Sequence, residues 1–197
     1  MVTLAVPLVL ASASPRRRAL LAQIGLAPTV APTGADETWP DGDPGPAVEA
    51  LALRKGRAAV DGGDHPGALV LAADTVVVLD GDVLGKPETP DEATAMLARL
   101  SGRTHTVYTG VALLHGDRAE TVHAATRVTF ADLRPDEIAA YVATGSPMDK
   151  AGAYGIQDDL GALLVARIDG EYTNVVGLPL RTLYESLRDR FPDLLVR

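Results

Sequence analysis

An aspartate interrupts a long run of apolar and β-branched residues in this sequence. Asp74 and Thr75 separate Leu69–Ala73 from Val76–Leu79, and a run of this composition is typical of a strand covered on both faces. A carboxylate in such a strand is energetically costly unless a cation or hydrogen-bond donors pair with it. Two interpretations follow. Asp74 either caps a neighbouring loop at a strand kink, or acts as a metal-binding or general-base carboxylate that a rigid strand positions.

Three consecutive arginines open a predicted helix near the N-terminus. Ser14 suits the N-cap, Pro15 the first helical position, and Gly25 the position just after the helix. Arg16–Arg18 lie in the first turn, where each exposed positive charge opposes the helix dipole by about 0.3–1 kcal/mol. They are either solvated or balanced by a bound anion. The strand predicted over Leu4–Ala11 and the hydroxyl-bearing turn after it favour a phosphate site at the helix N-terminus.

Two lysines lie where they can reach such a site. Lys55 follows the buried side of a helix predicted to begin at Pro46, so that its ammonium either reaches a cleft or lies on the surface. Asp80-Gly81 predicts a β-hairpin after the central strand. If this hairpin closes, Lys86 returns to the end of the sheet that holds Asp74.

Two further segments carry polar side chains in loops. Asp36 and Glu37 lie in a stretch rich in Pro and Gly, where neighbouring carboxylates are usually solvated. Asp149–Gln157 combines Asp, Lys, Tyr and Gln with glycines that allow a ligand to approach the backbone closely.

The remaining pattern predicts an α/β fold. A capping box at Thr89–Glu92 begins a helix, and further strands and helices follow it. The predicted strands are Thr104–Leu114, Glu120–Phe130 and Leu163–Ile168, and the predicted helices are Pro135–Ala143 and one after Gly177–Leu180. Because no repeat or long linker is evident, residues 1–197 are expected to form a single domain.

Composition excludes several classes of function. The 197 residues contain no cysteine, which rules out disulfides and cysteine-ligated metals. The formal net charge of −8 argues against a broad nucleic-acid-binding surface. No segment has the length of a membrane span, and the N-terminus lacks the order of a secretory signal. We therefore expect a cytoplasmic protein that binds neither membranes nor nucleic acids.

The chemistry that these groups favour is attack on a phosphate ester or anhydride. Walker A, GxSxG and GxGxxG patterns are all missing from the sequence. What remains is an anion-binding turn, two lysines and an embedded carboxylate. Basic groups would bind the phosphate oxygens, while a carboxylate positions a metal ion or deprotonates water.

Six motifs follow one another as they do in the Maf family of nucleoside triphosphate pyrophosphatases, which is named for a septum-formation phenotype. They are LASASPRRRALL, the Asp-Glu after Gly34-Ala35, LAADTVVVLDG with LGKP, LSGRTHTVYTGV, DKAGAYGIQ and NVVGLPL. The sequence resembles this family over nearly its whole length. The resemblance implies an α/β fold of the Maf/ITPase-like kind, an elongated mixed sheet flanked by helices. It also implies two lobes around a nucleotide cleft and a homodimer.

The resemblance also implies roles for individual residues. Asp74 matches the family's proton acceptor, and Asp74 and Glu37 are the expected ligands of a divalent metal cation, Mg²⁺ or Mn²⁺. The expected substrate-binding residues are Ser12, Arg16, Arg17, Lys55 and Lys86, and the expected specificity residues are Arg16, Thr75 and Gln157.

The resemblance thus predicts a hydrolase of nucleotide metabolism that converts a nucleoside triphosphate to the monophosphate and pyrophosphate. Arg16, Thr75 and Gln157 are of the kind found in the branch acting on dTTP and UTP. A role in removing non-standard nucleotides and a link to cell-division arrest are part of the same expectation. The alternatives are a 7-methyl-GTP pyrophosphatase, a generic phosphatase and a non-catalytic nucleotide-binding regulator of septum formation.

Two positions depart from the family pattern. Ser146 stands where Glu is frequent, and Gly56 stands where Ala usually follows the helix lysine. The glycine costs about 1 kcal/mol of helix propensity. Neither departure removes a predicted catalytic group.

Overall fold

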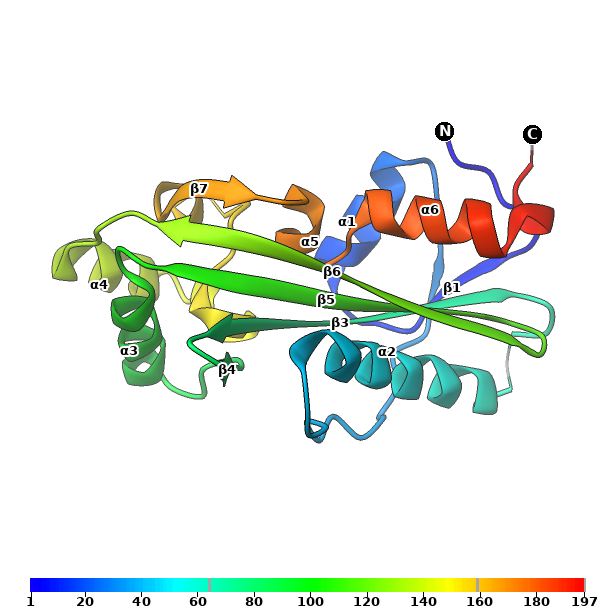
Figure 1. The fold of residues 1–197 in the computed structure, drawn as a ribbon, viewed down its shortest axis with the longest axis horizontal. Helices are drawn as coiled ribbons and strands as arrows, with labels where there is room; N and C mark the ends of the chain where they lie inside the picture. The colour runs from blue at the N-terminus through cyan, green and yellow to red at the C-terminus, as the bar shows by residue number, and fades with distance from the viewer. Residues whose placement is uncertain (64, 159, 197) are drawn as a thin grey trace. The chain divides into compact units, whose positions relative to one another are not determined.

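The computed structural model describes residues 1–63, 65–158 and 160–196, and the chain divides into two compact units (Figure 1). Three long strands contribute residues to both units: β3 (Leu69–Leu79), β5 (Thr104–His115) and β6 (Arg118–Phe130). The first unit comprises Met1–Asp74, Thr109–Ala124 and Gly177–Arg197, and the second comprises Thr75–Tyr108 and Ala125–Val176.

Within the described residues, seven strands form one sheet with the order β2-β1-β3-β5-β6-β7, and β4 pairs with β3. The strands β1 (Leu8–Leu10) and β2 (Thr29–Val30) are parallel to each other, and β1 is also parallel to β3. By contrast, β4 (Asp82–Leu84) and β7 (Val165–Asp169) form antiparallel pairs. The sheet is therefore mixed, and the predicted α/β class is confirmed.

In the first unit, helices cover both faces of the sheet. Helix α2 (Pro44–Asp61) packs one face, where Ala52 meets a cluster that includes Val70 and Leu114. Figure 1 shows α1 (Pro15–Gln23) and α6 (Leu180–Arg190) on the opposite side of the sheet from α2. Because β3 is covered on both faces here, its apolar residues form a continuous run rather than an alternating one.

The contact between α2 and β5 depends on a glycine. A Cβ atom added at Gly110 would lie 2.2 Å from the carbonyl oxygen of Val48 and 2.6 Å from the amide nitrogen of Glu49. Both atoms belong to the helix backbone, which cannot turn aside as a flexible side chain can. Gly110 therefore fixes how closely the helix that carries Lys55 approaches the sheet.

Gly110→Ala is expected to lower the free energy of unfolding by about 1–3 kcal/mol, because the added methyl group overpacks a backbone contact. Urea denaturation measures the change. Gly34→Ala is the matched control, because nothing lies within 4 Å of a Cβ atom added there. Equal unfolding midpoints for the two variants would show that α2 can move away from β5 at no cost.

The second unit combines the far ends of the long strands with β4, β7 and three helices. These helices are α3 (Pro90–Leu100), α4 (Pro135–Ala143) and the short α5 (Tyr172–Val176). The segment between α4 and β7 forms three 3-10 turns, at Ser146–Asp149, Ala151–Ala153 and Gly161–Leu163.

A buried aromatic cluster fills the core of the second unit. The His105 side chain is 2% exposed, and its Nε2 atom lies 2.8 Å from the hydroxyl of Tyr154. The imidazole meets Phe130 edge-on, with ring centroids 5.1 Å apart. Burial lowers the pKa of His105 to about 4, which keeps the ring neutral at physiological pH.

This histidine should make stability depend on pH. The unfolded chain binds a proton at His105 below about pH 6.5, whereas the folded chain binds it only near pH 4. Stability is therefore lost as the pH falls through this window, by about 3 kcal/mol. Urea denaturation between pH 7.5 and 4.5 should show a smaller loss for His105→Phe. The same loss in wild type and His105→Phe would contradict the prediction, and His65→Gln serves as the histidine control.

The predicted elements are present, and several of their bounds differ. The helix predicted over Pro135–Ala143 is confirmed. The strand predicted over Leu4–Ala11 is shortened to Leu8–Leu10, with Leu4 only in an isolated bridge to Leu195. Pro7 lacks a backbone N–H, which explains why regular pairing starts after it.

Three other bounds shift by two residues. Strand β6 begins at Arg118 rather than at Glu120. Helix α2 begins at Pro44 with Asp43 as its N-cap, rather than at Pro46. The strand predicted from Leu163 begins at Val165, because Gly161–Leu163 form a 3-10 turn. No helix in the described part of the chain is long and apolar enough to cross a membrane. That residues 1–197 form one domain stays a prediction.

Candidate functional site

A strand, a turn and a helix N-terminus meet in the first unit as predicted. Ser14 caps α1, and its Oγ atom accepts a hydrogen bond of 3.4 Å from the Arg17 amide, while Pro15 follows it. The Oγ atom of Ser12 accepts a hydrogen bond of 3.2 Å from the Ser14 amide. These two hydroxyls fix the turn between β1 and α1 and leave a helix N-terminus in an orientation suited to anions.

The guanidinium of Arg17 joins three parts of the first unit. Its Nη1 atom donates to the carbonyl oxygen of Ala73 at 2.7 Å and to Ser12 Oγ at 3.1 Å. Its Nε atom donates to the carbonyl oxygen of Gly177 at 2.9 Å. Arg17 thus ties the turn before α1 to β3 at the residue preceding Asp74.

Burial lowers the pKa of Arg17, an effect that the charges of Asp74 and Glu37 oppose and that of Arg16 reinforces. Positive and negative groups therefore lie close together around this guanidinium. The alternative of three solvated arginines is wrong, because Arg16 and Arg17 are half-buried and the Arg17 guanidinium donates three hydrogen bonds within the protein, although Arg18 is exposed.

Lys55 lies between two carboxylates. Its Nζ atom is 2.6 Å from Asp74 Oδ1 and 2.7 Å from Glu37 Oε1. The side chains of Lys55 and Asp74 are only 14% and 15% exposed, whereas that of Glu37 is 67% exposed. The cation that Asp74 needs inside its strand is therefore Lys55, and the interpretation of Lys55 as an ordinary surface lysine is wrong.

A short turn places Glu37. Asp36 Oδ1 accepts hydrogen bonds from the Thr38 amide at 2.9 Å and the Thr38 hydroxyl at 2.6 Å. Arg54, the neighbour of Lys55 on α2, donates to the Thr38 carbonyl oxygen at 2.8 Å. Sequence reasoning left Asp36 as a solvated loop residue and gave no role to Arg54. An Asp two residues before Thr is a recognisable signal for such a turn.

The two carboxylates are suited to a divalent cation. Asp74 and Glu37 converge on one point, the Lys55 ammonium, and carboxylate oxygens are the ligands that Mg²⁺ and Mn²⁺ prefer. Across residues 1–63, 65–158 and 160–196, no group of three or more His, Cys, Asp or Glu side chains is close enough together to hold a metal ion. These residues can therefore supply part of a coordination shell, and substrate oxygens and water would have to complete it.

Three predicted site residues belong to the second unit. Thr75 follows Asp74 on β3 and is half-buried. The predicted hairpin is confirmed by the positive φ angles of Asp80 and Gly81 (54° and 90°) and by the pairing of Val78 with Val83. Lys86 lies just beyond this hairpin and is exposed. Its approach to Asp74 stays a prediction.

Gln157, the third of these residues, is exposed after a buried stretch. The residues before it, Gly155 and Ile156, are buried, and a buried lysine supports the same segment. The side chain of Lys150 is 9% exposed and lies 3.2 Å from Asp158 Oδ2. Sequence reasoning placed this lysine in a segment whose glycines allow a ligand to approach the backbone, and did not predict its pairing with Asp158.

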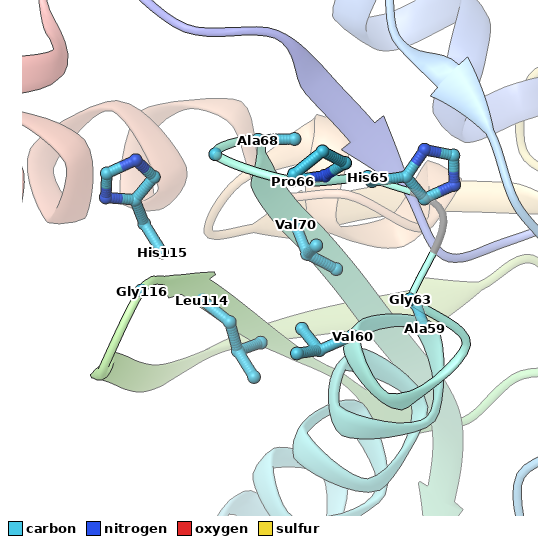
Figure 2. Close-up of a pocket in the computed structure, with 11 residues that line it drawn as sticks. Ala59, Val60, Gly63, His65, Pro66, Ala68, Val70, Leu114, His115 and Gly116 are labelled. Carbon is cyan, nitrogen blue, oxygen red and sulfur yellow. The ribbon is translucent and has the colours of Figure 1, made fainter.

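A cavity of about 210 Å³ lies elsewhere in the first unit (Figure 2). Figure 2 shows an apolar floor that includes Val60, Val70 and Leu114, with His65 and His115 nearby. It contains none of the predicted site residues. The cluster around Lys55 and Arg17 therefore remains the candidate functional site.

These features define an α/β protein with a basic helix N-terminus beside a paired carboxylate, as expected for an enzyme that acts on phosphorylated substrates. The family model described as Maf-like protein matches residues 7–190. The chain therefore belongs to the Maf-like protein family.

Curated relatives cover almost the whole chain. A protein named dTTP/UTP pyrophosphatase from Moorella thermoacetica is 60% identical over 91% of this chain and 93% of its own length. A protein of the same name from Salinibacter ruber is 54% identical over 98% of this chain and 95% of its own. Among solved structures, the Staphylococcus aureus Ham1 protein is 17% identical with a TM-score of 0.47, covering 64% of this chain and 72% of that one.

Proposed function

We propose that this protein hydrolyses nucleoside triphosphates, dTTP and UTP in particular, to the monophosphate and pyrophosphate. The observation that carries the proposal is the pairing of Asp74 with Lys55 at 2.6 Å in a shielded position. Arg17 lies close enough for its pKa to respond to Asp74. The relatives named dTTP/UTP pyrophosphatase support the choice of reaction and of substrates.

The first unit binds the triphosphate in this proposal. Ser12, Arg16 and Arg17 are at the N-terminus of α1, where amide groups and the helix dipole attract phosphate oxygens. Lys55 and Lys86 add positive charge, which neutralises the pyrophosphate as it leaves. The half-buried Arg17 guanidinium also holds the turn itself in place. Arg17 therefore both binds phosphate and positions the phosphate-binding turn.

Asp74 acts as the general base. It accepts a proton from the water that attacks the α-phosphorus, and pyrophosphate departs on the opposite side. In the substrate-free protein Lys55 pairs with this carboxylate. A bound triphosphate competes for the lysine, which frees Asp74 to accept the proton.

A divalent cation, Mg²⁺ or Mn²⁺, belongs to the proposal. Asp74 and Glu37 are the carboxylates that would hold it, since both converge on the Lys55 ammonium. When bound, the cation neutralises phosphate charge and polarises the phosphoryl group. The exposure of Glu37, at 67%, leaves this carboxylate accessible to an entering ion.

Arg16, Thr75 and Gln157 select the base or sugar in the proposed enzyme. Arg16 is half-buried next to the phosphate-binding turn, and Thr75 follows the base Asp74 directly in sequence. Gln157 exposes a carboxamide, which offers both a donor and an acceptor to a pyrimidine edge.

One assay separates this proposal from its alternatives. The purified protein is given dTTP, UTP, CTP and 7-methyl-GTP with Mg²⁺ or Mn²⁺, and pyrophosphate and orthophosphate are measured separately. Pyrophosphate released fastest from dTTP and UTP is the expected result. Orthophosphate alone would indicate a generic phosphatase, and preference for 7-methyl-GTP would indicate the other branch. Binding without hydrolysis would indicate a non-catalytic regulator.

We further propose that the enzyme is a cytoplasmic homodimer that binds neither membranes nor nucleic acids. Size-exclusion chromatography with light scattering tests the dimer. A growth assay that compares wild type with Asp74→Asn tests whether any link to cell division depends on catalysis.

A further inference from the structure

Asp158, the residue after Gln157, is held by two hydroxyl donors and one ammonium group in the second unit. Its Oδ2 atom accepts hydrogen bonds from the Tyr141 hydroxyl at 3.0 Å and the Ser146 hydroxyl at 2.5 Å. The Lys150 ammonium lies 3.2 Å from the same oxygen. The other oxygen, Oδ1, accepts from Gln157 Nε2 at 3.3 Å. One carboxylate thus connects a buried network to an exposed carboxamide.

The same network fixes the backbone turn that carries Gln157. The Tyr141 hydroxyl accepts a hydrogen bond of 2.9 Å from the Gly155 amide, and the Asp158 amide donates to the Gly155 carbonyl at 3.0 Å. A Cβ atom added at Gly155 would lie 2.5 Å from Lys150 Cε. Tyr141 is 1% exposed, so α4 anchors the turn from the core.

The departure at Ser146 fits this arrangement. A short hydroxyl at this position donates to Asp158 and also accepts from Lys150 Nζ at 3.2 Å. A glutamate there would bring a second carboxylate toward Asp158, and like charges at short range repel. Ser146 thus holds Oδ2 of Asp158, the oxygen that does not contact Gln157.

The chemistry of a carboxylate decides which way the Gln157 amide faces. Ionised aspartate only accepts hydrogen bonds, so the NH₂ group of Gln157 must point toward Asp158. The Oε1 atom of Gln157 then points away from Asp158. Gln157 therefore presents its acceptor, Oε1, on the side that faces away from Asp158.

We infer that Asp158 is a positioning residue that gives the enzyme its preference for uracil and thymine over cytosine, by turning Gln157 Oε1 toward the base. This inference rests on the proposed function. Uracil and thymine carry a hydrogen at N3, which donates to Oε1, whereas N3 of cytosine is itself an acceptor. Two acceptors that face each other cannot form a hydrogen bond, and an unmatched polar pair lowers affinity.

Asp158→Asn should change this preference. The Tyr141 and Ser146 hydroxyls that donate to Oδ2, and the Lys150 ammonium beside it, favour the one oxygen that the substituted amide retains. The NH₂ group of the new asparagine therefore faces Gln157. Gln157 must then turn its own oxygen toward that NH₂ group and its own NH₂ group outward, where it matches N3 of cytosine. We expect the ratio of kcat/KM for UTP to that for CTP to fall at least tenfold.

Two control variants separate positioning from support of the fold. Tyr141→Phe removes a donor to Asp158 and the acceptor of the Gly155 amide, but it leaves an acceptor-only carboxylate beside Gln157. It should lower Tm and reduce kcat/KM for UTP and CTP alike, with the UTP/CTP ratio within about threefold of wild type. In a Gln157→Ala background, Asp158→Asn should not change the UTP/CTP ratio further, because the side chain that Asp158 orients is absent. A ratio that moves equally in Tyr141→Phe and Asp158→Asn would overturn the inference.

A surface variant tests the inference even if Asp158→Asn does not fold. Gln157→Glu presents only acceptor oxygens at an exposed position, so UTP should remain preferred over CTP. A reversed preference would mean that the Gln157 NH₂ group faces the base, and the inference would be wrong. A wild-type enzyme that uses UTP and CTP equally would also overturn it. Absence of any pyrophosphate release by wild type would instead refute the proposed function.

Discussion

Asp74→Asn is expected to lower kcat for pyrophosphate release by about 10²–10⁴-fold, the usual contribution of a general base. Asparagine keeps the size of the side chain and an oxygen for the Lys55 ammonium, which now lies 2.6 Å from Asp74 Oδ1. The fold should therefore survive. Steady-state assays with UTP and dTTP measure the loss.

Binding should respond differently from turnover in the same variant. Loss of one carboxylate beside a polyanion removes a repulsive charge, so UTP measured in EDTA by calorimetry should bind as tightly as to wild type, or more tightly. Asp82→Asn is the control, because this carboxylate is exposed and its ion pair with Arg99 is a surface contact. A kcat of Asp74→Asn within threefold of wild type would rule out Asp74 as the base.

Arg17→Lys is expected to lower the free energy of unfolding by about 2–4 kcal/mol, although it conserves charge. The arginine fork reaches three acceptors at once, Ser12 Oγ and the carbonyl oxygens of Ala73 and Gly177. The single ammonium of lysine cannot reproduce that planar arrangement of donors. A buried acceptor that loses its hydrogen bond lowers the free energy of unfolding by about 1–3 kcal/mol. Thermal and urea denaturation measure the change.

Arg17→Lys should also lower kcat/KM for UTP, because the turn that binds phosphate loses the arginine hydrogen bonds that connect it to β3. Arg18→Lys provides the comparison on the same helix, since Arg18 is exposed. Its stability should stay within about 0.5 kcal/mol of wild type, as for most surface substitutions. If Arg17→Lys matched Arg18→Lys in both measurements, the hydrogen bonds of the Arg17 guanidinium would have no structural role.

The Gly56 position illustrates a balance that sequence alone misjudges. Glycine in a helix costs about 1 kcal/mol relative to alanine, yet a Cβ atom added at Gly56 would lie 2.4 Å from Leu114 Cδ1. Glycine at this position therefore lowers helix propensity, but it allows a close contact between α2 and β5. Alanine would gain helix propensity but would require the end of the Leu114 side chain, which packs in the cluster with Ala52 and Val70, to move.

Local sequence patterns predicted those elements that are stabilised by local interactions. Helix α1 begins where Ser14 and Pro15 predict, and the Asp80-Gly81 turn closes the expected hairpin, because caps and turns depend on residues a few positions apart. Strand β3 was predictable from its apolar run, since burial on both faces leaves a continuous signature. The strands that pair with β3 could not be predicted, because pairing partners are distant in sequence.

The sequence by itself thus determined the fold class, the phosphate-type chemistry and the carboxylate that needs a partner. Only the tertiary structure decided what that partner is. Lys55 lies 19 residues from Asp74, and Arg17 reaches a carbonyl 56 residues away. Such contacts depend on how closely α2 approaches the sheet at Gly110 and on how α1 follows β1. These are properties of tertiary packing, which a local sequence pattern does not predict. The same holds for Asp158, whose two hydroxyl donors and paired ammonium come from α4 and from the segment after it.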